Sequence, residues 1–171
     1  MVDADGYIKH LEDSAKNKRD EYGRCISFED LNNFDAFLNN FDAFDKGTAG
    51  PNFIFNLLDY KLWKKEKDKD FEFTYRDSVE HFYPQNPISG KSVENVDSFG
   101  NLCLITSDMN SRLNNLLPSA KRDIWNASKS QPSIKLSKML EVKEWNENAI
   151  KEHRINMFKV LYDVENPESQ N

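Results

Sequence analysis

Apolar residues recur at helical spacing over most of the chain and change to strand-like alternation in its middle. A direct seven-residue repeat over 32–45 places four aromatic side chains on one helical stripe, namely Phe34, Phe37, Phe41 and Phe44. Such a stripe is typical of an amphipathic helix that faces a core. A coiled-coil seam is the alternative, but two heptads are few for a coiled coil.

Further helices are predicted on either side of the middle region. The segment 47–51 contains two glycines and a proline, which is typical of a break before a helix over about 52–68. Later helices are expected after residue 106, from Pro118, and over about 144–162. The pattern therefore predicts a mainly helical protein.

The middle of the chain has the pattern of two strands joined by a loop. Phe71, Phe73 and Tyr75 alternate with polar residues, which favours a strand. The short apolar run at 101–106 favours a second strand. Between them, residues 84–100 are rich in Pro, Asn, Ser and Gly and are expected to form a loop.

Composition indicates one folded domain. A chain of 171 residues suits a single domain. Hydrophobic residues make up only 38% and charged residues 30%, but 12 Phe, 6 Tyr and 3 Trp supply large apolar surfaces that disordered segments lack. We therefore expect a core that is built from aromatic side chains.

The charge and the cysteines exclude several classes of protein. A net charge of −6 argues against a general nucleic-acid coat, but not against a nuclease, because metal sites need acids. No run approaches the roughly 20 apolar residues that cross a bilayer. The acidic N-terminus does not resemble a secretory signal, and Cys25 and Cys103 form no CxxC pair. The expected compartment is the cytoplasm.

One of the three histidines stands out. His10 and His153 lie in charged, helical surroundings and are expected to serve solubility alone. His81 directly follows Glu80 near the end of the first predicted strand. Adjacent side chains of a strand face opposite sides, so the backbone must twist or bulge here if both residues are to serve one site.

Two asparagines complete the pattern. Asn101 opens the second predicted strand and Asn110 falls in the first turn of the next helix. This order of acid-His, loop, strand and helix resembles the ββα-metal fold of the HNH nuclease superfamily. It is most similar to the HNH-like C-terminal domain of GmrSD-type restriction endonucleases. The matching residues are Glu80-His81-Phe82-Tyr83-Pro84-Gln85, Gly100-Asn101-Leu102-Cys103-Leu104, Asn110 and Lys121.

The resemblance implies an α+β fold, in which a mainly helical domain encloses a ββα-metal motif. We expect a single domain over 1–171, with a helical N-terminal part at 1–70, the ββα-metal core at 71–121 and C-terminal helices at 122–171. The implied activity is that of a metal-dependent DNA endonuclease in a restriction or defence system. Longer relatives also carry a nucleotide-hydrolysing domain. The chain has no Gly-rich phosphate loop, so it is expected to be the nuclease part, with that activity in a partner domain or subunit.

The residue types suit phosphodiester hydrolysis. His81 is the candidate general base, because imidazole titrates near neutral pH. Glu80 and the side-chain oxygen of Asn110 are hard ligands suited to Mg²⁺ or Mn²⁺. These three residues are expected to converge in one small cleft. Glu80 stands where the superfamily commonly has Asp, which leaves its mode of metal contact open.

The remaining roles come from the resemblance. It implies that the amide of Asn101 holds the loop after His81 and does not touch the metal. Lys121 and Arg112 are candidate contacts to the phosphates of DNA. The alternative for Lys121 is an ordinary solvent lysine, and the alternative for Arg112 is an orientation away from the site.

A non-catalytic module is the alternative function. In this hypothesis a degenerate HNH scaffold serves only for DNA binding or partner docking. The acidic balance and the glutamate at position 80 favour this alternative. The joint presence of Glu80, His81 and Asn110 favours the nuclease, because an inactive site has no chemical reason to keep all three.

Overall fold

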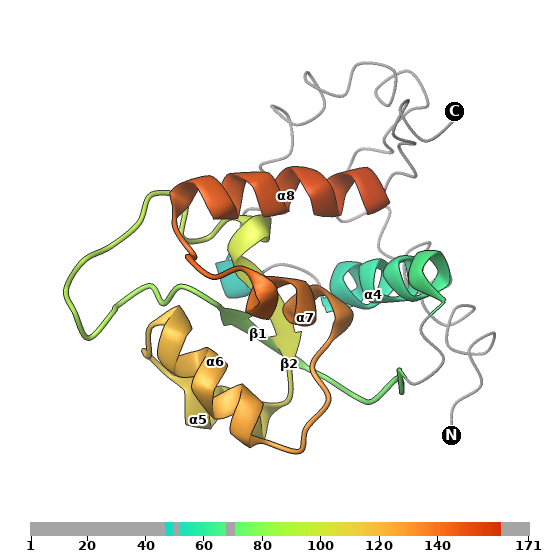
Figure 1. Cartoon of the computed structure of the whole chain (residues 1–171), viewed down its shortest axis with the longest axis horizontal. Helices are drawn as coiled ribbons and strands as arrows, with labels where there is room; N and C mark the ends of the chain where they lie inside the picture. Colours follow the sequence, from blue (N-terminus) through green and yellow to red (C-terminus); the bar gives the residue numbers. More distant parts are fainter. Residues whose placement is uncertain (1–46, 50–51, 68–70, 162–171) are drawn as a thin grey trace.

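The structure is a computed structural model that describes residues 47–49, 52–67 and 71–161. The helix predicted over 32–45 lies outside the described residues, as do His10 and Cys25. Within the described part the fold is α+β and mostly helical, as predicted (Figure 1). In chain order the elements are η1 (Gly47–Ala49), α4 (Asn52–Glu66), β1 (Ser78–His81), η2 (Phe99–Asn101), β2 (Leu102–Ile105), α5 (Ser107–Leu113), α6 (Pro118–Ala127), α7 (Ile134–Glu141) and α8 (Glu147–Leu161).

The sheet consists of β1 and β2, paired antiparallel. The pairs are Ser78 with Ile105, Val79 with Leu104, Glu80 with Cys103, and His81 with Leu102. The strand predicted at 101–106 is thus confirmed as β2. It ends where Thr106 caps α5, because the Thr106 hydroxyl accepts a hydrogen bond from the backbone N–H of Met109 at 3.3 Å.

The strand predicted around 71–75 is wrong, since β1 begins only at Ser78. In the register of the ladder, residues 71–75 would lie opposite residues 108–112, and these belong to α5 and not to a strand. The earlier segment instead contacts the loop before α7. The backbone N–H of Glu72 donates to Oε1 of Gln131 at 2.9 Å, and Nη2 of Arg76 donates to the Gln131 carbonyl at 3.0 Å.

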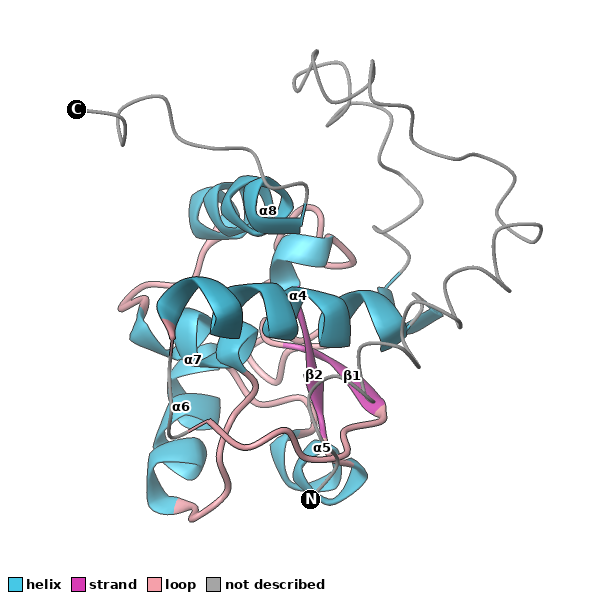
Figure 2. Ribbon diagram, turned by 90° about the vertical axis from the view of Figure 1, so that its right-hand side faces the viewer, coloured by secondary structure: helices cyan, strands magenta, loops and turns pink. Residues whose placement is uncertain are grey.

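Alternation along β2 gives the sheet two different faces. Leu102 and Leu104 pack into a core cluster with side chains of α4 and α8. Cys103 and Ile105 pack into a second cluster with side chains of α5, α6 and α7. Accordingly, α8 lies at the top and α5 at the bottom of both views (Figures 1 and 2). The core is rich in aromatic residues, as the composition predicts.

The four helices predicted within the described residues are confirmed, and the one expected after residue 106 is α5. The helix predicted over 52–68 is α4, and Pro118 is the first residue of α6, where its missing N–H costs nothing. The last helix begins at Glu147 and not at 144, so the buried Trp145 precedes it. No helix of the described residues has the length and apolar character that a membrane crossing requires.

His153 is a correction to the sequence analysis, because it is not a solvated residue. It is only 7% exposed. The spacing along α8 places it between Ile150 and Met157 on the buried stripe. Its ring lies edge-on to Trp145 at 5.4 Å, and its Nε2 has no partner among the described residues. Burial holds the pKa of His153 well below its ordinary value, so the ring is neutral.

Candidate functional site

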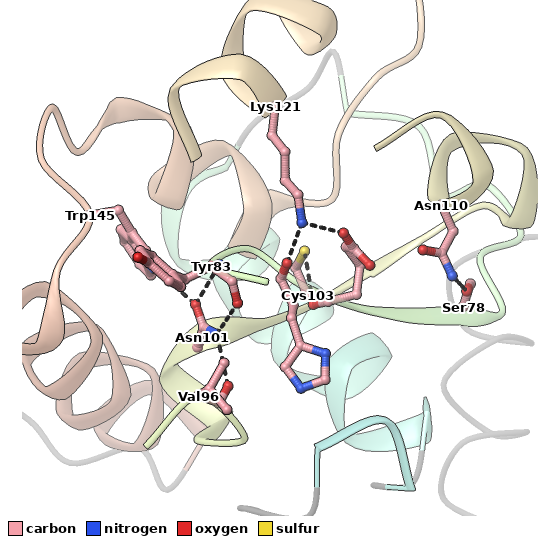
Figure 3. Close-up of polar contacts among 10 residues, drawn as sticks. Ser78, Tyr83, Val96, Asn101, Cys103, Asn110, Lys121 and Trp145 are labelled. Atoms are coloured by element: carbon pink, nitrogen blue, oxygen red, sulfur yellow. Dashed lines mark hydrogen bonds and ion pairs between the residues drawn. The ribbon is translucent and has the colours of Figure 1, made fainter. Parts of the chain in front are cut away.

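Glu80 forms a buried ion pair with Lys121. The Glu80 side chain projects from β1, and its Oε1 accepts a hydrogen bond from the ammonium of Lys121 on α6. Figure 3 labels the Lys121 side chain and marks its contacts with dashed lines. The same ammonium donates to the main-chain carbonyl of His81 at 2.5 Å. Lys121 is 1% exposed, so it is neither a solvent lysine nor at the surface. The reason is its place on the buried stripe of α6, between Pro118 and Trp125.

Asn110 is brought to the same face of the sheet as Glu80. Its Nδ2 donates to the hydroxyl of Ser78 at 2.6 Å (Figure 3). Ser78 and Glu80 are two residues apart on β1, so their side chains share a face. The Oδ1 of Asn110 makes no hydrogen bond within the part of the chain that the structure describes. One carboxylate and one amide oxygen therefore lie along one face of β1.

His81 projects from the other face. The ladder is regular from Ser78 to His81, so the twist or bulge that a shared site requires is not present in β1. Glu80 and His81 consequently point to opposite sides of the sheet, so Glu80, His81 and Asn110 do not share one face of β1. Their convergence in one small cleft stays a prediction. The imidazole is 6% exposed, and its Nε2 lies 2.8 Å from Oδ1 of Asp97.

Asn101 clamps the loop that follows His81. Its Oδ1 accepts the Tyr83 backbone N–H at 2.8 Å and the Trp145 Nε1–H at 2.9 Å (Figure 3). Its Nδ2 donates to the carbonyls of Tyr83 at 2.9 Å and Val96 at 2.8 Å. The side chain is fully buried and both of its polar atoms are engaged. The loop-holding contact that the resemblance implies is therefore present.

The sequence analysis missed Asp97. Its Oδ1 accepts hydrogen bonds from His81 and from Nε2 of Gln85, both at 2.8 Å. Its backbone carbonyl accepts from the N–H of Gly47 at 3.3 Å. The sequence contains no signal for this contact, because Asp97 lies in a loop 16 positions from His81.

Cys103 does not qualify as a nucleophile, although it is paired with Glu80 in the sheet. Burial raises the pKa of the Cys103 thiol to about 12, and the neighbouring Glu80 adds to the shift. Its Sγ lies 3.7 Å from the Glu80 carbonyl. The thiol is thus protonated and inert at neutral pH.

Two surface features carry positive charge. Arg112 is exposed on the last turn of α5, with its Nη1 3.6 Å from Sδ of Met109. A separate open groove of about 570 Å³ lies beside the Asn101 clamp. Its lining includes three basic residues that the sequence analysis missed and one acidic residue, namely Lys91, Arg122, Lys143 and Glu144. Both features face solvent.

A closed metal cage is absent from the described residues, where no three His, Cys, Asp or Glu side chains gather. The oxygens of Glu80 and Asn110 alone suit Mg²⁺, which is commonly bound by one or two carboxylates together with waters and substrate phosphates. The donor types therefore fit a hard divalent cation that shares its coordination with a substrate. Glu80 would have to share its carboxylate between that cation and Lys121.

Comparison with protein families places the chain among nuclease domains. It matches the family described as GmrSD restriction endonucleases, C-terminal domain, over residues 28–160, which is more than half of its length. The chain therefore belongs to this family, which implies a nuclease-related role and DNA as the substrate. No match was found among curated proteins or among solved structures.

Proposed function

We propose that this chain is a metal-dependent DNA endonuclease, the nuclease part of a GmrSD-like restriction system. Glu80 and Asn110 hold Mg²⁺ or Mn²⁺, and His81 is the general base. The observation that carries the proposal is the placement of the Asn110 amide on the Glu80 face through its hydrogen bond to Ser78. Family membership supports the same chemistry.

The bound cation would orient the phosphate and neutralise charge on the leaving oxygen. Glu80 and Asn110 supply hard oxygen ligands on one side of β1. Lys121 holds the Glu80 carboxylate and the His81 carbonyl together, so it sets the position of both residues. Lys121 is thus a buried residue that positions Glu80 and His81. Exposed residues such as Arg112 would contact the DNA.

The opposite orientation of Glu80 and His81 is compatible with hydrolysis. In an in-line displacement the attacking and leaving oxygens lie on opposite sides of the phosphorus. A phosphate beside the edge of β1 that is unpaired in the described residues would meet the base from one face of the strand and the ligands from the other. The Asn101 clamp fixes the loop that follows His81, and so limits the movement of His81.

DNA binding would use the exposed cations. Arg112 and the groove residues Lys91 and Lys143 supply charge for phosphates, in a chain that is acidic overall. Nucleotide hydrolysis, where the system needs it, would come from a partner domain or subunit. The expected compartment is the cytoplasm, where a restriction nuclease meets foreign DNA.

The test is cleavage of supercoiled plasmid with and without Mg²⁺ or Mn²⁺. Nicked or linear product should appear only with metal. His81→Ala should lower the rate by about 10²–10⁴ while DNA affinity is retained. Asn110→Ala should also lower it, whereas Asn115→Ala, which removes an exposed amide beyond the end of α5, should not. Unchanged cleavage by His81→Ala would exclude His81 as the base.

One observation favours the non-catalytic alternative. The Glu80 carboxylate is neutralised by Lys121, which leaves less charge for a cation. The same plasmid experiment separates the two functions. A protein that shifts DNA in a gel but cuts it with neither metal would be a binding module. Metal-dependent product that is lost in Glu80→Gln would exclude that alternative.

A further inference from the structure

The contact between His81 and Asp97 determines which ring nitrogen of His81 carries a proton. The two atoms, Nε2 and Oδ1, are 2.8 Å apart. An ionised carboxylate can only accept a hydrogen bond, so Nε2 must be the donor. In a neutral imidazole the other nitrogen then bears the lone pair. The geometry therefore selects one tautomer, with Nδ1 as the basic atom.

The Asp97 carboxylate is held in place although 47% of its side chain is exposed. The Gln85 amide donates to the same Oδ1, which gives a role to the glutamine of the family motif. The Asp97 carbonyl accepts from the Gly47 N–H, and Asn101 binds the carbonyl of the preceding residue, Val96. Contacts from three separate segments thus fix Asp97 against His81.

Gly47 closes the Nε2 side of the ring. Its φ is +55°, and a Cβ added there would lie 2.5 Å from Oδ1 of Asp97 and 3.5 Å from Nε2 of His81. A substrate cannot reach Nε2 through a space that does not admit a methyl group. Nδ1 is therefore the ring nitrogen that remains for chemistry.

We propose that Asp97 is a positioning residue that keeps the His81 proton on Nε2 and leaves Nδ1 as the nitrogen that accepts a proton from water. Asp97 itself touches neither the substrate nor the proposed cation. Only the role of Nδ1 as a base rests on the proposed function. The tautomer can be measured without any cleavage.

The first experiment is NMR of the ¹⁵N-histidine-labelled full chain at alkaline pH, where a histidine ring is neutral. The His81 ring signals are assigned by their loss in His81→Ala. We expect a protonated Nε2 and an unprotonated Nδ1, with a slowly exchanging Nε2–H. In Asp97→Ala this proton should exchange rapidly. A His81 ring with its proton on Nδ1 in the unaltered chain would overturn the proposal.

The second experiment is plasmid cleavage with Mg²⁺ or Mn²⁺. Asp97→Ala should lower kcat on the order of 10–100-fold with little change in KM, as for other outer groups that orient a functional histidine. Asp97→Asn should fall between Asp97→Ala and the unaltered chain, because its oxygen can still accept from Nε2–H. An unchanged kcat in Asp97→Ala would overturn the role of Asp97.

A glycine pair provides a matched control. Gly47 and Gly90 both have a positive φ, +55° and +71°, but Gly90 has no atom within 4 Å of an added Cβ. Gly47→Ala should lower kcat and speed exchange of the Nε2–H, while Gly90→Ala should change neither. If the ring has the expected tautomer but no metal supports cleavage, the proposed nuclease activity fails and the assignment of the ring proton stands.

Discussion

Two buried lysines meet the same end of the sheet and differ in their partners. The ammonium of Lys121 donates to the carbonyl of His81, and the ammonium of Lys135 donates to the carbonyl of Leu102. His81 and Leu102 are directly paired in the ladder. Each lysine is 1% exposed. The burial of the two side chains is therefore equal, and only their surroundings separate them.

Among the residues that the structure describes, the ammonium of Lys121 has a carboxylate partner and that of Lys135 has none. The Lys135 ammonium contacts the carbonyls of Phe99 and Leu102 and lies 4.8 Å from the centre of the Phe99 ring. Asp59 reaches only its backbone N–H, at 2.9 Å. Burial lowers the pKa of Lys135 to about 7 and raises that of Asp59 to about 6. Equal burial thus goes with different partners, and of these two lysines only Lys121 has its ammonium paired with a carboxylate.

Breaking the Lys121 pair should have the largest effect on stability. Lys121→Met leaves the Glu80 carboxylate buried without a countercharge, which typically costs about 3–5 kcal/mol of unfolding free energy. Replacing both residues, Glu80→Met with Lys121→Met, should recover most of that loss. Urea denaturation measures both variants. A loss below about 1 kcal/mol for the single variant would show that the pair is not buried in solution.

The pH dependence of stability should report Lys135. Its pKa of about 7 in the folded state lies below the unfolded value of 10.5, so the unfolded chain binds more protons between these values. Stability should therefore rise with pH above 7, by at most about 1.4 kcal/mol per pH unit. Urea denaturation at several values between about pH 7 and pH 9 measures the slope.

The range from about pH 7 to pH 9 avoids the other groups whose pKa is shifted. Below this range, the shifted pKa values of Asp59 and His153 change stability in opposite directions with pH. Above it, the raised pKa of Cys103 lowers stability as pH rises. Lys135→Met should remove the slope. Lys138 is the control because its side chain is partly exposed, and Lys138→Met should keep the slope. A slope that persists in Lys135→Met would assign it to another group.

Asn101 lies next to Leu102, at the same end of the sheet as both lysines. Asn101→Ala leaves buried partners of four hydrogen bonds unpaired, which should cost about 1–3 kcal/mol and slow cleavage by loosening His81. Asn101→Asp should destabilise the fold at least as much as Asn101→Ala, because it loses both donated hydrogen bonds and buries a charge. Thermal melting and plasmid cleavage check this. Loss of metal binding with unchanged melting would instead make Asn101 a ligand.

The smallest effect is expected at Trp145. Trp145→Phe keeps the edge contact with Phe82 at 5.1 Å but removes the Nε1–H donated to Asn101. The expected cost is about 0.5–1.5 kcal/mol by urea denaturation. Trp125→Phe is the matched control, because the Trp125 Nε1 has no hydrogen-bond partner among the described residues. An equal loss in both variants would attribute the effect to ring size.

Local patterns predicted the features that depend on neighbouring residues. The periodicity of α4, the proline at the start of α6 and the apolar run of β2 each specify an element from a few adjacent positions. The order of motifs indicated the family and the holding role of Asn101. Helix and strand propensities act over such short distances, so these predictions needed no partner from elsewhere in the chain.

Long-range packing decided the rest. The strand predicted around 71–75 is absent because the residues that would lie opposite it in the ladder form α5. Lys121 meets Glu80 across 41 positions, and Asp97 meets His81 across 16. Charged side chains have no periodic signal for a single distant partner, and only the tertiary fold brings that partner within hydrogen-bond distance. The proposed choice of a ring nitrogen on His81 follows from the contact with Asp97.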